Sequence, residues 1–155
     1  MRVYADSSFI LHLVLAEPDS ERVIGEYRRM GRPALFFLPL HTLEVRNAIL
    51  QRAFHQRRAL ASSERQEVVR HRDAAFRRLE HLIARRTLLD ATTDMEPTIA
   101  RANQLSAAHT EKLGLRAIDL LHVASALMLE SKLFLTTDKR QALLAKAEGL
   151  KVVTA

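Results

Sequence analysis

The sequence has no cysteine and little glycine, proline or aromatic content, and these shortages exclude several classes of protein. Without cysteine in 155 residues, disulfides, thiolate zinc sites and cysteine nucleophiles are all excluded. Four glycines and four prolines exclude collagen-like and low-complexity chains, and 5% aromatic residues without tryptophan argue against single-strand binding by base stacking. No apolar run approaches the roughly 18 residues that cross a bilayer, and Asp6 and His12 interrupt any signal-peptide pattern. We expect a cytoplasmic protein without membrane association, folded as a single domain over residues 1–155.

Positive charge is concentrated in one segment of the chain. The formal net charge is +6, and 19 of the 24 basic residues are arginine. Between Arg46 and Arg86 there are 11 arginines, no lysine and four acids, so this segment carries +7 and the remainder sums to −1. Such a segment suits contacts with phosphates or with a carboxylate-rich partner, because the guanidinium group binds both through two hydrogen bonds. From charge alone, however, a solvated helix face is the favoured interpretation.

Short apolar runs alternate with longer segments of helical periodicity. Strands are predicted at Val3–Ala5, Ala34–Leu38, Thr87–Leu89, Leu133–Thr136 and Val152–Val153. Helices are predicted at Phe9–Ala16, Ser20–Met30, Leu40–Arg58, Ser63–Arg85, Thr93–Gly114, Arg116–Ser131 and Asp138–Glu148, with Ser63 and Thr93 opening capping boxes. Strands separated by helices favour an α/β fold with a mainly parallel sheet and helices on both faces. In the third helix, the stripe of Leu40, Leu43, Leu50 and Phe54 is the expected buried face.

Four carboxylates are placed where ligand sites form in such sheets, at the carboxyl ends of the strands. Asp6 follows the first strand, and Asp138 follows the strand Leu133–Thr136. Glu44 lies in the first turns of the helix after the second strand, and Asp119 begins the helix before Leu133. Taken singly, Asp6, Asp119 and Asp138 also suit the first turn or N-cap of a helix, so capping remains an alternative for each.

Glu44 is expected to be partly buried, and Asp119 is expected to be buried. Glu44 borders the apolar stripe of its helix, and the helix from Arg116 is apolar on two sides, so Asp119 must face a specific partner. Buried carboxylates are costly unless they are paired or bind a metal. Several of them without a nearby Lys or Arg would repel one another, which a divalent cation relieves. Oxygen ligands without cysteine suit Mg²⁺ or Mn²⁺.

Four stretches of the sequence resemble a known family when they are taken together. They are VYADSSFI at the start, LHTLEVRNAI around Glu44, RAIDLLHVASAL around Asp119 and FLTTDKRQ around Asp138. In order and spacing the chain resembles the PIN-domain nucleases, particularly the VapC-type toxins of bacterial toxin–antitoxin pairs. The third and fourth stretches are the most specific of the four.

The resemblance implies a three-layer α/β/α sandwich and a ribonuclease that requires Mg²⁺ or Mn²⁺. Carried over by position, the metal-binding and catalytic acids are Asp6, Glu44, Asp119 and Asp138. Supporting roles fall to Ser7 or Ser8, Asn47 and Thr136. The implied partners are an RNA substrate, a cognate antitoxin protein and a second copy in a homodimer. The segment Arg46–Arg86 falls where such toxins carry protruding helices, and it is longer and more basic than is typical.

The resemblance to this family, and the repulsion expected among the carboxylates, predict how two variants should behave. Asp6→Asn and Asp119→Asn should each abolish metal-dependent RNA cleavage. Without metal, both variants should be no less stable than the wild type, because like-charge repulsion is relieved.

The sequence also allows other roles for its histidines and other classes of protein. His122 follows Asp119 by one turn. It could be a metal ligand, a proton carrier or a histidine hydrogen-bonded within the core, and the last role is favoured. No role is assigned to His41. A haloacid-dehalogenase-like phosphatase needs a second Asp at the position of Ser8. A receiver domain would use Asp6, Asp90 as phosphoacceptor and Lys139, but Asp6 has no acidic neighbour. A catalytically silent PIN scaffold that binds RNA or protein is the remaining alternative.

Overall fold

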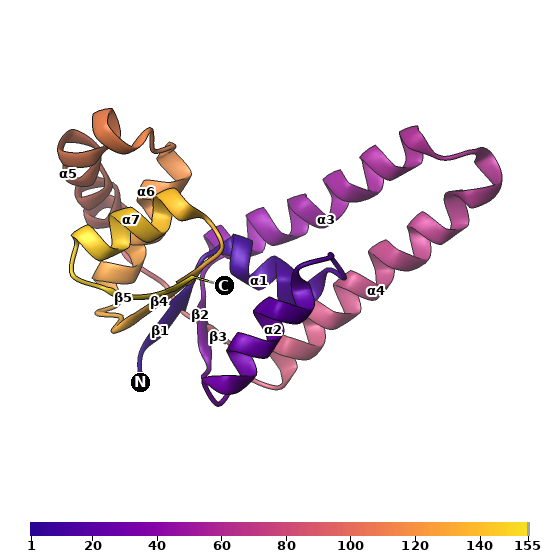
Figure 1. The fold of residues 1–155 in the computed structure, drawn as a ribbon, viewed down its shortest axis with the longest axis horizontal. Coiled ribbons are helices and arrows are strands. Elements are labelled where there is room, and N and C mark those ends of the chain that lie inside the picture. Colours follow the sequence, from indigo (N-terminus) through magenta and orange to yellow (C-terminus); the bar gives the residue numbers. More distant parts are fainter. Residues whose placement is uncertain (155) are drawn as a thin grey trace.

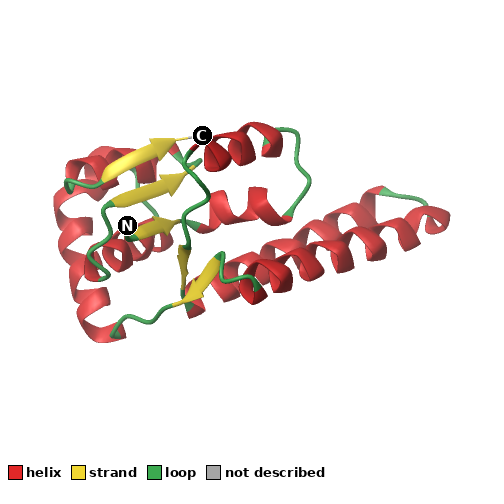
Figure 2. Ribbon diagram, turned by 90° about the horizontal axis from the view of Figure 1, so that it is seen from below, coloured by secondary structure: helices red, strands yellow, loops and turns green. Residues whose placement is uncertain are grey.

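A computed structural model describes residues 1–154 and shows a sheet of five parallel strands (Figure 2). The strands are β1 Val3–Ala5, β2 Leu35–Phe37, β3 Leu88–Asp90, β4 Leu133–Thr136 and β5 Lys151–Thr154, in the order β3-β2-β1-β4-β5. Every neighbouring pair is parallel. The predicted parallel α/β fold is confirmed, and the strand boundaries differ from the prediction by no more than one residue at either end.

Helices cover both faces of the sheet and form the outer layers of an α/β/α sandwich (Figure 1). Helices α1 Ser7–Val14, α2 Ser20–Arg29, α3 Pro39–Ala59 and α4 Arg65–Ala84 pack on the face that carries Val3 and Ala5. Helices α5 Met95–Leu113, α6 Ala117–Met128 and α7 Lys139–Ala147 pack on the face that carries Tyr4 and Phe134. Side chains alternate along β1, so one strand supplies both cores. Within residues 1–154, no helix is long and apolar enough to cross a membrane.

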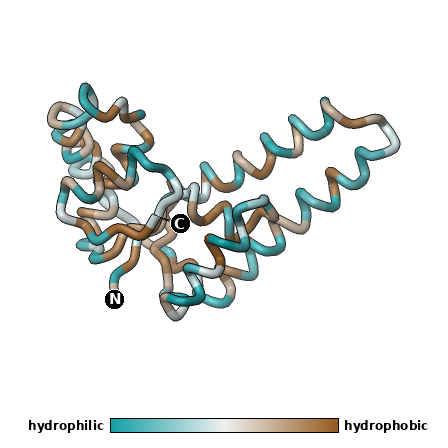
Figure 3. The backbone as a smooth tube through the Cα atoms, in the orientation of Figure 1, coloured by the Kyte–Doolittle hydropathy of each residue, from teal (hydrophilic) through white to brown (hydrophobic). Residues whose placement is uncertain are grey.

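Helices α3 and α4 form a long antiparallel hairpin that projects from the sandwich (Figure 1). A single 3-10 turn, Ser62–Glu64, joins the two helices at the outer end. Hydrophobic residues continue along α3 into the projecting part, as the hydropathy colouring shows (Figure 3). The hairpin therefore carries most of the segment Arg46–Arg86 away from the sheet.

Most of the apolar stripe predicted as the buried face of α3 lies on the surface instead, and of its four residues only Leu40 packs against the core. Leu43 is 68% exposed, Leu50 is 50% exposed and Phe54 is 54% exposed. The buried positions of α3 are His41, Val45, Ile49 and Ala53. The prediction was wrong because α3 is apolar on two faces, and periodicity shows which residues share a face but not which face packs.

Two predicted helix starts also differ from the structure. Ser63 opens no capping box; it lies in the 3-10 turn, and α4 begins at Arg65 without a side-chain cap bond. Asp94, not Thr93, caps α5, and its carboxylate accepts a hydrogen bond from the Glu96 N–H. Thr93 and Asp94 are both good cap residues, so the sequence alone does not choose between them.

Candidate active site

The four predicted acids lie together in one pocket at the carboxyl edge of the sheet. Asp6 directly follows β1, Asp138 follows β4 and precedes α7, and Glu44 and Asp119 lie on α3 and α6. All four line a pocket of about 290 Å³, together with Ser7, Ser8, Asn47, Arg116, His122 and Gln141, among others. The topology accounts for this convergence, because parallel strands end at the same edge and the helices that follow them begin there.

Asp6 is fully buried and is surrounded by neutral donors. It caps α1 by accepting a hydrogen bond from the Phe9 N–H at 3.0 Å, so the capping interpretation is confirmed. Ser8 Oγ donates to both carboxylate oxygens at 2.7 and 2.8 Å, and Thr136 Oγ1 donates to Oδ2 at 2.8 Å. Burial raises the pKa of Asp6 above its ordinary value, although these donors and nearby His122 counter the effect in part.

Glu44 is joined to the protein core through His122. Its Oε2 atom accepts a hydrogen bond from Ser7 Oγ at 2.7 Å and lies 2.5 Å from His122 Nε2. The other ring nitrogen of His122 lies 2.9 Å from the Tyr4 hydroxyl in the core. Partial burial acts to raise the pKa of Glu44, but the His122 and Ser7 contacts outweigh it and the pKa is lowered. His122 is thus a buried, hydrogen-bonded histidine, as favoured, and it also orients a pocket carboxylate.

His41 has a structural role at the start of α3. Its Nδ1 atom accepts a hydrogen bond from the Leu38 N–H at 2.9 Å, and its Nε2 atom lies 2.8 Å from the Ala5 carbonyl oxygen. Burial lowers the pKa of His41 to about 3, so the ring is neutral at physiological pH. His41 therefore ties α3 to the end of β1 and positions the helix that carries Glu44.

Asp119 is fully buried and pairs with Arg116, the N-cap residue of the same helix. Arg116 Nε lies 3.1 Å from Asp119 Oδ2, and Nη2 lies 2.9 Å from Oδ1; the Arg116 N–H also donates to Oδ2 at 2.9 Å. The same Nη2 atom lies 3.5 Å from Asp138 Oδ2. Burial acts to raise the pKa of Asp119, but Arg116 lowers it below the ordinary value.

The expectation that these acids have no cationic neighbour is therefore wrong. Arg116 stands three residues before Asp119, a spacing that brings side chains together in the first turn of a helix. This spacing is visible in the sequence, in which Arg116 also marks the predicted start of the helix. For Asp119, the expectation that neutralisation costs no stability loses its basis, because its ionised form is paired and not repelled.

Asp138 and Gln141 complete the wall of the pocket. Asp138 caps α7 by accepting hydrogen bonds from the N–H groups of Arg140 and Gln141 at 2.8 and 3.2 Å, so its capping interpretation is confirmed. The Gln141 side chain does not reach back to this cap but donates through Nε2 to Asp119 Oδ1 at 3.2 Å. Its Oε1 atom is buried with no hydrogen-bond partner.

The lining of the pocket fits a hard divalent cation in its chemistry. Carboxylates, hydroxyls and amides supply oxygen donors, which Mg²⁺ and Mn²⁺ prefer, and the unpaired Gln141 Oε1 is a further acceptor. Each carboxylate is at present held by protein partners, and no three His, Cys, Asp or Glu side chains of residues 1–154 form a ready-made metal site. The residues that would hold the cation are Asp6, Glu44, Asp119 and Asp138.

The three residues that a receiver domain would use, Asp6, Asp90 and Lys139, do not lie in one site. Asp90 ends the edge strand β3 and is exposed, and neither Asp90 nor Lys139 lines the pocket of Asp6. Of the predicted supporting residues, Ser7 contacts Glu44, whereas Ser8 and Thr136 both contact Asp6. Asn47 lines the same pocket.

Comparison with known proteins agrees with this architecture. No curated protein matches the sequence. The structure of FitAcB from Neisseria gonorrhoeae resembles this fold with a TM-score of 0.61 and 18% sequence identity, covering 98% of this chain and 96% of that chain. Residues 3–147 match the family described as PIN domain, a range that contains all four pocket acids. The chain therefore belongs to the PIN-domain family, whose members are generally nucleases.

Proposed function

We propose that this chain is a divalent-metal-dependent ribonuclease that hydrolyses RNA phosphodiester bonds. The observation that carries the proposal is the convergence of Asp6, Glu44, Asp119 and Asp138, from four separate elements, on one pocket of a PIN-family chain. In this proposal the four acids hold Mg²⁺ or Mn²⁺ and are the catalytic residues. Residues 1–155 act as one catalytic domain.

The residues around the pocket have different chemical roles in the proposed reaction. A bound cation supplies Lewis acidity, which lowers the pKa of a water molecule and offsets charge on a phosphate oxygen. Ser8 and Thr136 fix the Asp6 carboxylate, and Ser7 and His122 fix Glu44, so neither acid has to be oriented when substrate arrives. A pocket carboxylate accepts the proton of the attacking water. In-line attack forms a bond between the water oxygen and phosphorus and breaks the P–O3′ bond. The 3′-oxygen takes up a proton from solvent, so the products are a 5′-phosphate and a 3′-hydroxyl.

The projecting hairpin is suited to contact the RNA backbone. Glu44, Ala48 and Gln51 line the pocket, and His55 and Arg58 continue the same face of α3 at helical spacing. At 1.5 Å per residue, Arg58 lies about 21 Å beyond Glu44 along the helix. Arg57, Arg58 and Arg65 surround an open hollow near the outer end. A strand of RNA leaving the pocket along α3 would therefore meet arginine side chains.

The biological role we propose is that of a cytoplasmic, VapC-type toxin with a cognate antitoxin, acting as a homodimer. The exposed apolar stripe of α3, composed of Leu43, Leu50 and Phe54, supports the homodimer, because large apolar side chains exposed on one helix face are typical of a protein interface. The remaining basic surface of the hairpin is available to an acidic antitoxin.

The decisive experiment measures cleavage of RNA by the purified protein with Mn²⁺, with Mg²⁺ and with a chelator. We expect cleavage only with a cation. Asp6→Asn and Asp119→Asn should each lower the rate by more than about 100-fold, the upper range for residues that only support metal ligands. Asp90→Asn is the matched control, since Asp90 is exposed and outside the pocket.

Two outcomes would contradict the proposal. Cleavage that survives in Asp119→Asn would show that the acids are not the catalytic residues. A wild-type protein that binds RNA but never cleaves it would instead favour a catalytically silent PIN scaffold.

A further inference from the structure

Arg116 occupies an unusual position, because it places a positive charge directly on the acids of the proposed cation site. Its guanidinium group contacts both oxygens of Asp119 and one oxygen of Asp138, so it bridges α6 and the cap of α7. Among the ion pairs of residues 1–154, it is the only Lys or Arg paired with any of the four pocket acids.

The two sides of this ion pair differ in their exposure to solvent. The Asp119 side chain is 0% exposed, whereas the Arg116 side chain is 60% exposed. A buried carboxylate needs a partner at all times, because an unpaired buried charge is strongly destabilising. The guanidinium group is already largely in water and can turn outward without a comparable loss. Arg116 can therefore leave the ion pair at little cost if another positive charge takes its place. Asp119 needs such a positively charged partner in either case.

A divalent cation requires the same oxygen atoms that Arg116 now contacts. A cation bound by Asp119 and Asp138 would lie beside the guanidinium group, and like charges at such a distance repel in a partly buried site. Binding of the cation and pairing by Arg116 are therefore mutually unfavourable.

We propose that Arg116 is a built-in counter-ion that competes with the divalent cation for Asp119 and Asp138. The inference rests on the proposed function, since it takes these acids as cation ligands. Without a cation, Arg116 offsets part of the negative charge of Asp119 and Asp138 and stabilises the fold. When a cation binds, Arg116 releases the two carboxylates and turns to solvent, so the measured cation affinity includes the loss of its ion pairs.

The test is the affinity for Mn²⁺, measured by titration calorimetry on the full-length metal-free protein. Arg116→Gln should bind Mn²⁺ about tenfold more tightly than the wild type, within the usual range of coupling between two binding events. Arg116→Lys keeps the charge but cannot bind both carboxylate oxygens at once, and it should bind Mn²⁺ about threefold more tightly, since lysine acts as a point charge. Arg116→Lys also keeps the test open if the Gln variant does not fold.

Arg140→Gln is the matched control. Arg140 lies beside the same cap, but its guanidinium group donates to the Gly114 carbonyl oxygen at 3.1 Å and makes no ion pair with the four acids. This variant removes one positive charge from the first turn of α7 without breaking an ion pair to the four acids, and its Mn²⁺ affinity should stay within about twofold of the wild type.

Thermal unfolding gives a second readout that is independent of activity. Without a cation, Arg116→Gln should melt at a lower temperature than the wild type, because buried Asp119 loses its partner. Saturating Mn²⁺ should raise the melting temperature more in the variant than in the wild type, since the cation supplies the missing charge.

The outcomes separate this inference from the proposed function. If all proteins bind Mn²⁺ and Arg116→Gln, Arg116→Lys and Arg140→Gln have wild-type affinity, the counter-ion role is overturned and the metal site stands. If neither the wild type nor any variant binds Mn²⁺, the metal-dependent function is overturned together with this inference.

Discussion

Asp6 and Asp119 are both fully buried carboxylates, but they have opposite kinds of neighbour. Neutral hydroxyl and N–H donors surround Asp6, and its pKa is raised mainly by burial. Arg116 pairs with Asp119, and its positive charge keeps that pKa lowered despite burial. Ionised Asp6 therefore reduces the stability of the metal-free protein at neutral pH, whereas ionised Asp119 contributes to it.

Neutralising each residue should consequently change stability in opposite directions. Asp6→Asn should be as stable as the wild type at pH 7 or more stable, because asparagine caps a helix as well as aspartate does. Asp119→Asn should lose about 1.5–3 kcal/mol, the usual value of hydrogen bonds to a charged group. The Asp119 contribution is present above its ordinary pKa of 3.8 and should disappear as the pH falls below that value.

Urea unfolding of the metal-free variants between pH 7 and pH 3 measures both effects. Asp6→Ala serves as the control for the α1 cap and should be about 1 kcal/mol less stable than Asp6→Asn. Equal destabilisation by Asp6→Asn and Asp119→Asn would show that the two environments do not differ as described.

At the scale of elements, the sequence predicted the positions of the strands and the edge at which the acids meet. That success depends on one topological rule, because residues that follow parallel strands must share an edge. The partner of each acid was not predictable in the same way, since Thr136 reaches Asp6 from another strand and His122 reaches Glu44 from another helix. Arg116 is the exception, because its spacing to Asp119 lies within one helical turn.

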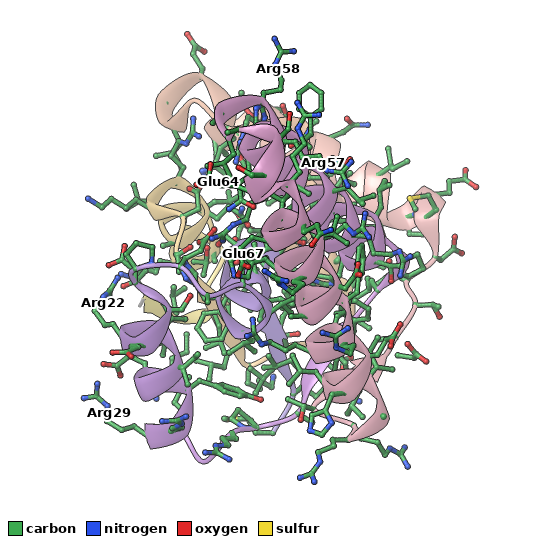
Figure 4. All side chains as sticks on the ribbon, turned by 90° about the vertical axis from the view of Figure 1, so that its right-hand side faces the viewer. Arg22, Arg29, Arg57, Arg58, Glu64 and Glu67 are labelled. Atoms are coloured by element: carbon green, nitrogen blue, oxygen red, sulfur yellow. The ribbon has the colours of Figure 1, made fainter. Side chains whose placement is uncertain are left out.

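The α3–α4 hairpin shows a second limit of sequence reasoning. The segment Arg46–Arg86 was identified by charge, but its arginines are not equivalent in the structure. Arg70 pairs with Glu67, and Arg52 lies 3.2 Å from a Glu17 carboxylate oxygen. Arg57 and Arg58 are exposed near the outer end of the hairpin, with Arg58 over the Phe54 ring (Figure 4). These two side chains are the best candidates for contacts with phosphates.

The double variant Arg57→Gln, Arg58→Gln tests the hairpin as an RNA track. We expect weaker RNA binding for all sequences and a salt dependence about 1.4 less steep, because each phosphate of a single strand that an arginine neutralises adds roughly 0.7 to the slope. Filter-binding or anisotropy titrations over a range of salt concentrations measure both quantities. Arg22→Gln, Arg29→Gln is the matched control, because it removes the same charge from exposed positions of α2, well apart from the hairpin end in Figure 4. Equal losses of RNA affinity in the two double variants would show that the outer end of the hairpin makes no special contact with RNA and is a solvated helix face.

At the scale of the whole molecule, the exposed stripe of α3 predicts a dimer. Leu43 and Leu50 are each at least half exposed, so their replacement by glutamate should change the stability of the monomer by no more than about 0.5 kcal/mol. A charge buried against a second copy is far more costly. In sedimentation equilibrium, we expect the wild type at twice 17.6 kDa and the double variant Leu43→Glu, Leu50→Glu as a monomer. Leu143→Glu is the control, since Leu143 on α7 is also 53% exposed but lies outside the stripe. A dimer that survives in the double variant would exclude this face as the interface.

The proposed toxin role predicts the behaviour of the protein in a living cell. A nuclease whose only restraint is a separate partner protein should arrest growth when it is expressed in a bacterial host without that partner. Asp6→Asn should be tolerated, because its fold is expected to be intact while its proposed cation site has one ligand fewer. Asp90→Asn should arrest growth like the wild type, since the exposed Asp90 carboxylate ends β3 outside the pocket. Growth curves after induction, at matched protein levels, compare the three. If the wild type and Asp6→Asn are tolerated equally, the toxin role is contradicted, and the nuclease function is then decided by the cleavage assay alone.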